Sequence, residues 1–222
     1  MAILEGLQAL QCDFLGDFYG KRCVSLNQKV KALALKHNFE FSSARACQSV
    51  IVRSEGSNPQ YTLYIKGADN KIVSNLVDQS QASNAQRVSD DFASQGFRTL
   101  FYAMRSLSKE EYERIRKQYN QLKQTPDSGQ RIQDFLAKEV EVGLTFLGFV
   151  VLRDELQKQV GETIQQLRDA GVKIWMVTGD KSQTALSIGK QTMMLHQNQY
   201  ILMFDKKMPE TGQGHGGGKL DL

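Results

Sequence analysis

Residues 171–189 read GVKIWMVTGDKSQTALSIG and join an apolar run to a polar turn. The run from Val172 to Val177 is nearly unbroken, which is typical of a strand buried on both faces in a parallel sheet. The turn Thr178-Gly179-Asp180-Lys181 then opens a helix. Ligands in open α/β sheets bind at the carboxyl ends of strands, where helix N–H groups attract anions. The stretch therefore predicts a phosphate-binding edge, although an ordinary strand-to-helix turn can carry the same short string.

Length and composition describe an ordinary globular chain. Its 222 residues are 41% hydrophobic and 23% charged, enough for one large or two small domains. The net charge of +4 is dispersed, which suits an anionic nucleotide. A nucleic-acid partner would want a clustered basic face, so none is expected. Three scattered His and three Cys without a CxxC pair predict no metal site. No apolar stretch approaches the ~20 residues of a membrane helix, so the fragment itself is expected to be soluble.

The hydrophobic pattern changes character near residue 153. Before it, hairpins and helices mix in an α+β manner, and after it strand and helix alternate in a Rossmann-like manner. The first 18 residues are read as a helix that runs into a turn at Gly16-Asp17. Strands are expected over residues 39–53, 60–66, 99–104, 144–152, 172–177 and 200–204. Helices are expected over residues 70–79, 85–95 and 184–194, after the capping box at 108–111, and around Leu156–Leu167.

Five strings in order resemble the cytoplasmic half of a P-type ATPase, in the phospholipid-transporting (flippase) class. They are FEFSSAR with SVIVR at 39–45 and 49–53, KGAD at 66–69, GFRTL at 96–100, DELQ at 154–157, and the opening stretch. Glu155 stands where the flippase class usually has Lys. The resemblance implies an α/β chain with a nucleotide-binding domain and part of a haloacid-dehalogenase-like phosphorylation domain.

The same resemblance implies a domain organisation and a set of partners. Residues 1–153 would form an N-terminally truncated nucleotide-binding domain with an antiparallel sheet. Residues 154–208 would form a partial Rossmann-type phosphorylation domain, followed by a flexible glycine-rich tail at 209–222. The parent would be an integral membrane protein with this region on the cytoplasmic side. ATP and Mg²⁺ would be its cofactors, phospholipid its transported substrate, and an accessory membrane subunit a further partner.

The resemblance also assigns binding residues. Phe41 would stack on adenine, whereas the strand pattern alone favours a core phenylalanine. Lys66 would offer a flexible charge to phosphate or the adenine edge, and Gly67 would let the backbone approach the ligand. Arg98 would reach the phosphates. The nucleotide-binding residues expected in all are Phe41, Ser43, Arg45, Lys66, Gly67, Arg98, Asp154, Thr178, Gly179 and Asp180.

Two further roles combine chemistry with the resemblance. Asp154 could cap the helix that follows it and, by resemblance, contact the ribose at the hinge between the domains. The Thr178 hydroxyl could donate to a phosphoryl oxygen, a preorganised contact of the kind phosphoryl transfer needs. Asp180 would act near the nucleotide or its metal ion, and Lys181 would add positive charge.

The sequence departs from the family at two points. Ala46, Cys47 and Gln48 replace two basic residues and a Met, so phosphate attraction and ATP affinity should be weaker. The chain also contains no DKTGT string, whose Asp the family phosphorylates, and no GDGxND string. We therefore expect no catalytic residue here and no turnover by this chain alone, although the family is one of enzymes.

Three functions are compatible with these observations. The first is an ATP-binding cytoplasmic fragment of a lipid-translocating P-type ATPase. The alternative is a non-catalytic, regulatory ATP-binding module derived from such a pump. A soluble haloacid-dehalogenase-like phosphatase is least favoured, because Asp205-Lys206 lacks the Thr-Gly-Thr that should follow a nucleophile of that kind.

Overall fold

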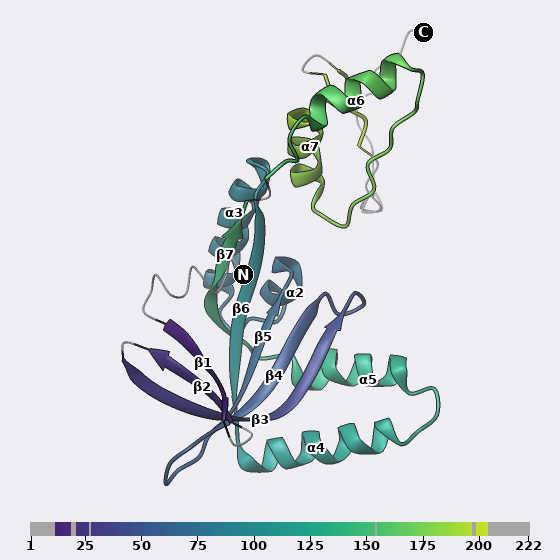
Figure 1. The fold of residues 1–222 in the computed structure, drawn as a ribbon. Helices are drawn as coiled ribbons and strands as arrows, with labels where there is room; N and C mark the ends of the chain where they lie inside the picture. Colours follow the sequence, from purple (N-terminus) through teal and green to yellow (C-terminus); the bar gives the residue numbers. More distant parts are fainter. Residues whose placement is uncertain (1–11, 19–20, 27, 154, 197–198, 204–222) are drawn as a thin grey trace.

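A seven-stranded antiparallel sheet forms the centre of the computed structural model, which describes residues 12–18, 21–26, 28–153, 155–196 and 199–203 (Figure 1). The strands lie side by side in chain order, β1 to β7. Their bounds are Cys12–Phe18 (β1), Lys21–Leu26 (β2), Lys29–Ser42 (β3), Cys47–Ser54 (β4), Tyr61–Gly67 (β5), Arg98–Leu107 (β6) and Thr145–Leu152 (β7). The predicted α/β class with an antiparallel sheet in the first part of the chain is confirmed.

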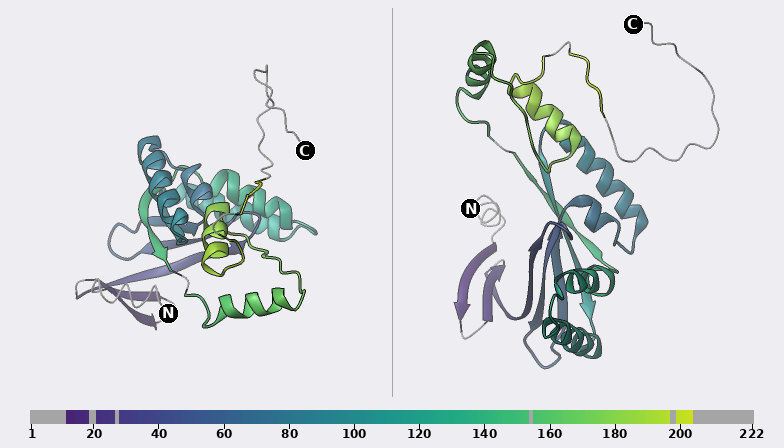
Figure 2. Two further views of the ribbon diagram at one scale, coloured as in Figure 1. Left: turned by 90° about the horizontal axis from the view of Figure 1, so that it is seen from above. Right: turned by 90° about the vertical axis from the view of Figure 1, so that its right-hand side faces the viewer.

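The helices between residues 69 and 140 cover one face of this sheet, and strands β1 and β2 form one of its edges (Figure 2). Two helices lie between β5 and β6: α2 (Asp69–Val73) and α3 (Gln79–Ser94). Between β6 and β7 lie α4 (Lys109–Lys123), α5 (Gly129–Phe135) and the short π-helix η1 (Leu136–Val140). After β7 come α6 (Val160–Asp169) and α7 (Ser182–Gln191). Within the described residues, none of these helices has the length and apolarity to cross a bilayer.

The core lies between the sheet and the helices that cover it. In β5, Leu63 and Ile65 are buried while Tyr64 and Lys66 are exposed, the period of two that a half-buried strand requires. Leu63 and Ile65 pack in one cluster with side chains from the helical layer, including Ile115. The sheet therefore has a buried face and an open face, and the open face is free to carry polar function.

Polar caps start the two long helices. Asp78 precedes α3, and its side chain accepts from the backbone N–H groups of Ser80 and Gln81. Ser108 and Glu111 form a reciprocal capping box at the start of α4, which confirms the capping box expected from the sequence. Each such cap stabilises its helix by about 1 kcal/mol.

Two expectations for the first 53 residues are wrong. Cys12–Phe18 is a strand that pairs with β2, not the end of a helix, because the ladder to Lys21–Leu26 outweighs local helix propensity. The single strand expected over 39–53 is instead two strands, β3 and β4, joined by a turn at residues 43–46. Ala46 adopts a positive φ of 54° in that turn, and the sequence pattern did not predict this conformation.

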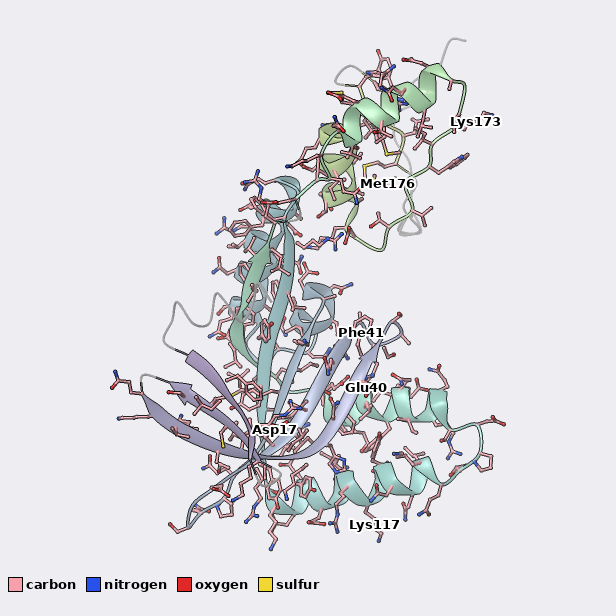
Figure 3. The ribbon with its side chains drawn as sticks, in the orientation of Figure 1. Asp17, Glu40, Phe41, Lys117, Lys173 and Met176 are labelled. Atoms are coloured by element: carbon pink, nitrogen blue, oxygen red, sulfur yellow. The ribbon has the colours of Figure 1, made fainter. Side chains whose placement is uncertain are left out.

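The expected strand at 172–177 is also absent from the structure. This segment joins α6 to α7 without a ladder partner, and Trp175 and Val177 are 83% and 95% exposed. The side chains of Lys173 and Met176 are drawn on it in Figure 3, well away from the sheet. A strand apolar on both faces needs neighbours on both sides, and the described residues place none beside it. Residues 200–203, also expected as a strand, likewise form no ladder.

Replacing Gly67 with alanine should destabilise the sheet. A Cβ at this position would lie 2.6 Å from Cys47 Cβ and 2.7 Å from the Ala46 carbonyl oxygen. We expect a loss of about 1–3 kcal/mol in the free energy of unfolding, measured by urea denaturation. Gly129→Ala is the matched control, since nothing lies within 4 Å of a Cβ there. Equal stability of the two variants would contradict the close packing of β4 on β5.

Candidate functional site

A register shift in β3 decides which way Phe41 faces. Phe39 pairs with Ser49, but Ser42, rather than Phe41, pairs with Cys47. The extra residue is a bulge, and it places Phe41 on the face opposite to buried Phe39. Phe41 is accordingly 64% exposed, whereas Phe39 is 2% exposed. Phe41 is therefore not the core residue that the strand pattern favoured; Figure 3 shows it with Glu40 near the end of β3.

Phe41 begins a row of side chains that crosses the open face of the sheet. Gln48 is the next residue across, on β4, and it pairs with Lys66 on β5. Lys66 pairs in turn with Tyr102 on β6. Gln48, Lys66 and Tyr102 line a cavity of about 260 Å³ that also includes Arg22. The row thus offers aromatic, amide and cationic groups on a rigid surface drawn from four strands.

Gly67 lies beside this row for a steric reason. It pairs with Cys47, and the backbone at Ala46 lies too close to admit any side chain at this position. The N–H of Ala68 also donates to the Ala46 carbonyl oxygen at 3.0 Å. Gly67 therefore fixes the turn that follows Phe41 against the end of β5. The structure gives it this packing role, whereas close approach to a ligand remains an expectation.

Arg45 points into the protein, not toward the open face. It is 4% exposed and forms an ion pair with Glu141, which follows η1 and is fully buried. The guanidinium also donates to Gln133 Oε1 at 2.6 Å and to the Glu40 carbonyl oxygen. Ser49 Oγ donates to the same carboxylate at 2.7 Å. This cluster ties the turn after Phe41 to the helical layer.

Cys47 belongs to the same buried cluster and is chemically quiet. Burial and the neighbouring Glu141 carboxylate raise the pKa of its thiol to about 12. The thiolate is the reactive form of cysteine, so Cys47 is protonated and inert at neutral pH. Sequence reasoning missed Glu141 altogether, because no local signal links it to Arg45, 96 residues away.

A second group of expected residues meets beyond the ends of β5 and β6. A cavity of about 180 Å³ is lined by Arg98, Gly179 and Asp180 together with Asp69 and Lys181. Arg98 Nη2 lies 3.0 Å from Asp180 Oδ2. The Thr178 hydroxyl donates to the same carboxylate at 2.9 Å and accepts from the Asp180 N–H at 3.1 Å. The structure therefore brings the GFRTL and TGD strings together.

Asp69 and Lys181 are residues of this cavity that the binding set predicted from the sequence did not include. Asp69 is 5% exposed, and its carboxylate forms an ion pair with the Lys181 ammonium. Burial pushes the pKa of Asp69 upward, but hydrogen bonds from Lys181, Ser89 and the Asn70 N–H outweigh it and hold that pKa below its usual value. The KGAD string marked the position of Asp69 without indicating its partner.

The ten expected residues fall into two groups and three exceptions: buried Arg45, Ser43 and Asp154. Phe41 and Lys66 lie on the open face, with Gly67 beside them, while Arg98, Thr178, Gly179 and Asp180 lie at the second cavity. Ser43 is exposed in the turn after β3. Asp154 lies outside the described residues. Within the described residues, no three His, Cys, Asp or Glu side chains come together as a metal-binding group.

Removing the Arg45 charge should strongly destabilise the protein. Arg45→Met leaves the Glu141 carboxylate buried, and in the described part of the chain Lys71 Nζ, at 3.9 Å, is then the one cation paired with it. We expect a loss of about 3–5 kcal/mol in the free energy of unfolding. Arg114→Met is the control, because its pair with Glu139 is solvent-exposed and should contribute about 0–1 kcal/mol. Similar losses in both variants would refute the buried pair.

The Asp69 carboxylate should make stability depend on pH. Its pKa is lower in the folded state, so its contribution is present above the unfolded value of about 3.9 and is lost as pH falls through the folded pKa. The difference in unfolding free energy between wild type and Asp69→Asn should therefore shrink as pH falls below about 4. Urea denaturation at a series of pH values measures it, and a difference independent of pH would contradict the prediction.

Comparison of the sequence with known proteins shows which family the chain belongs to. Residues 2–159 match the family model described as P-type ATPase, cytoplasmic domain N. Phospholipid-transporting ATPase DRS2 of Saccharomyces cerevisiae is 37% identical over 76% of this chain and 12% of its own length. Two Schizosaccharomyces pombe proteins, phospholipid-transporting ATPases C887.12 and dnf2, are 31% and 34% identical over 94% and 85% of the chain.

The chain spans only a small part of these relatives, 16% and 13% of the two Schizosaccharomyces pombe proteins. The family match nevertheless covers most of the chain and includes every strand of the sheet. The expected resemblance is confirmed, and the chain belongs to the P-type ATPase family, in which its residues 2–159 correspond to the cytoplasmic domain N.

Proposed function

We propose that this chain is the ATP-binding part of a phospholipid-translocating P-type ATPase. Adenine would rest on Phe41 at the open face of the sheet, and the triphosphate would run toward Arg98 and the Thr178–Asp180 loop. The observation that carries this proposal is the exposure of Phe41 at the end of a row with Gln48 and Lys66. An exposed aromatic ring suits a purine, whose flat π face stacks on aromatic side chains, and Lys66 lies two strands away across the sheet.

The geometry of β6 supports the path from base to phosphate. Tyr102 stands in the row opposite Lys66, and Arg98 lies four residues earlier on the same strand. At about 3.3 Å per residue, that spacing is roughly 13 Å. One strand therefore links the open-face row to the second cavity, and a single extended nucleotide could contact both.

The residues of the second cavity fit a triphosphate and its metal ion. Arg98 offers planar N–H donors that suit phosphate oxygens. The exposed Thr178 hydroxyl has one proton, so it would turn away from the Asp180 carboxylate to donate to another phosphate oxygen. The Asp180 carboxylate is a ligand type that Mg²⁺ accepts when it arrives with a nucleotide. Bound Mg²⁺ would neutralise phosphate charge there. By resemblance, Asp154 would contact the ribose between the two groups.

We assign Arg45 a different part in this function. Its guanidinium is committed to Glu141, Gln133 and the Glu40 carbonyl oxygen, so it would hold the turn that carries Phe41 and Ser43 instead of binding phosphate. With Ala46 and Cys47 in place of the two basic residues, the adenine side then relies on Lys66 and Arg22 for positive charge. Weak ATP affinity is the expected consequence.

In the parent protein, lipid transport would require parts of the protein outside this chain. The curated relatives are named phospholipid-transporting ATPases, and by resemblance the parent would be a membrane protein that moves phospholipid between leaflets. An accessory membrane subunit would be a further partner. The residues of this chain would bind and orient ATP. We also propose that the residues after 153 form part of a haloacid-dehalogenase-like domain.

A regulatory ATP-binding module is the second candidate function. The loss of basic residues at Ala46 and Cys47 favours it, because a pump that turns over needs effective phosphate capture. The coding sequence on either side of this chain separates the two: a DKTGT string and membrane helices there support the pump, and their absence supports the module.

Phe41→Ala should weaken ATP binding by about 5- to 150-fold, the equivalent of about 1–3 kcal/mol of lost stacking. Isothermal titration with Mg²⁺–ATP measures it. Phe14→Ala is the control, because Phe14 on β1 is 54% exposed and lies outside the row. Tripolyphosphate should bind both variants and wild type alike. A Phe41→Ala protein that binds ATP as well as the control does would overturn the proposed adenine site.

A further inference from the structure

We propose that Asp69 is a positioning residue that docks the Thr178–Lys181 loop against the end of the sheet by holding the Lys181 ammonium. The inference rests on the proposed function for its consequence, the capture of phosphate, but the docking itself does not require a nucleotide. It gives the last residue of the KGAD string a physical role and removes Lys181 from the set of free phosphate-binding cations.

The Asp69 carboxylate is built into a rigid receptor. Asp69 opens α2 directly after Gly67-Ala68, and its Oδ1 accepts from the Asn70 N–H at 2.7 Å. Its Oδ2 accepts from Ser89 Oγ on α3 at 2.7 Å. Two helices therefore fix this carboxylate at the rim of the second cavity. A buried carboxylate so placed is expensive without a cation, and Lys181 is the cation that it contacts.

Lys181 is enclosed from more than one side. Besides Asp69, its Nζ lies 2.7 Å from Asp90 Oδ1 and donates to Ser89 Oγ at 3.3 Å. Burial alone would lower the pKa of Lys181, but the hydrogen bonds that its ammonium donates to Asp69 and Asp90 raise that pKa above its usual value. The ammonium therefore stays charged and paired. Three residues from α2 and α3 thus hold one residue of the loop.

Packing next to the loop agrees with docking. A Cβ at Gly96, which follows α3, would lie 2.7 Å from Ser187 Oγ on α7. Thr184, in the first turn of α7, is 2% exposed. The chain after Lys181 is thus pressed against the C-terminal end of α3, and Figure 2 shows α7 beside that helix. Lys181 forms the polar part of a contact that α7 continues.

The docking has a consequence for phosphate binding. With Lys181 held, Thr178 and Asp180 stay within reach of Arg98, as their mutual contacts show. Donors that are already in place lose little freedom when a phosphate arrives. Loss of the Asp69 charge should therefore weaken the binding of ligands that carry a triphosphate. It should leave adenosine, which reaches only the open-face row, unaffected.

Amide hydrogen exchange tests docking without any ligand. The reporters are the N–H groups of Asp180, which donates to Thr178 Oγ1, and Ala185, which donates to the Lys181 carbonyl oxygen. We expect both to exchange roughly tenfold faster in Asp69→Asn and in Lys181→Met. Lys181→Arg should retain the protection, because it keeps the charge.

Asp91→Asn is the matched control for this experiment. Asp91 lies on α3 next to Asp90, but its carboxylate is 66% exposed and lies 4.0 Å from Arg87. Its substitution should leave the exchange of Asp180 and Ala185 as in wild type. Equal exchange in Asp69→Asn and Asp91→Asn would overturn the proposal. An increase in exchange throughout β4 and β5 as large as that at Asp180 and Ala185 would overturn it as well, since that result would show general destabilisation without a separate release of the loop.

Titration calorimetry with adenosine and with Mg²⁺–ATP tests the consequence. Asp69→Asn and Lys181→Met should each weaken ATP binding about tenfold, the double variant no more than either single one, and adenosine binding should change less than twofold. Equal losses for both ligands would overturn the positioning role. If wild type binds neither ligand, the proposed function fails, and the exchange experiment still decides whether Asp69 docks the loop.

Discussion

The pairing of Cys47 with Ser42 on one side and Gly67 on the other is the constraint on which the proposed adenine side depends. Because Ser42 rather than Phe41 meets Cys47, the ring of Phe41 turns to the open face. Gly67 makes that pairing sterically feasible, and the buried Arg45–Glu141 pair holds the intervening turn to the helical layer. A shift of one residue in this register would return Phe41 to the core side and remove the site.

Charged groups stabilise the two halves of the site by different means. Arg45 and Glu141 are almost completely buried, so their pair is costly to disturb and fixes one geometry. Arg98 and Asp180 keep 48% and 22% of their side chains exposed, so water screens their pair and a phosphate can compete for the arginine. The proposed adenine side is therefore held by a buried pair and the proposed phosphate side by an exposed one, which would suit a site where an anion must enter and leave.

Local patterns predicted the elements that depend on local chemistry. The capping box at Ser108, the alternation of β5 and the polar turn at Thr178–Lys181 could all be read from neighbouring residues. Contacts between distant residues could not. Glu141 lies far in sequence from Arg45 and Ser49, and Lys181 lies far from Asp69, so no periodicity connects them. The bulge that exposes Phe41 could not be predicted from neighbouring residues either, because it depends on the register with β4. Only the family resemblance indicated that the Phe41 ring binds a ligand.

The apolar run at 172–177 shows why a correct local pattern can still give a wrong element. Its residues are those of a strand buried on both faces, yet a parallel strand exists only through neighbours that supply hydrogen bonds and cover its side chains. None of the described residues does this, and Trp175 remains exposed. No sheet therefore fixes the loop that follows the run. Side-chain contacts of Lys181 and the packing of α7 on α3 determine its position instead. A few charged groups, rather than a backbone ladder, consequently control the phosphate side of this molecule.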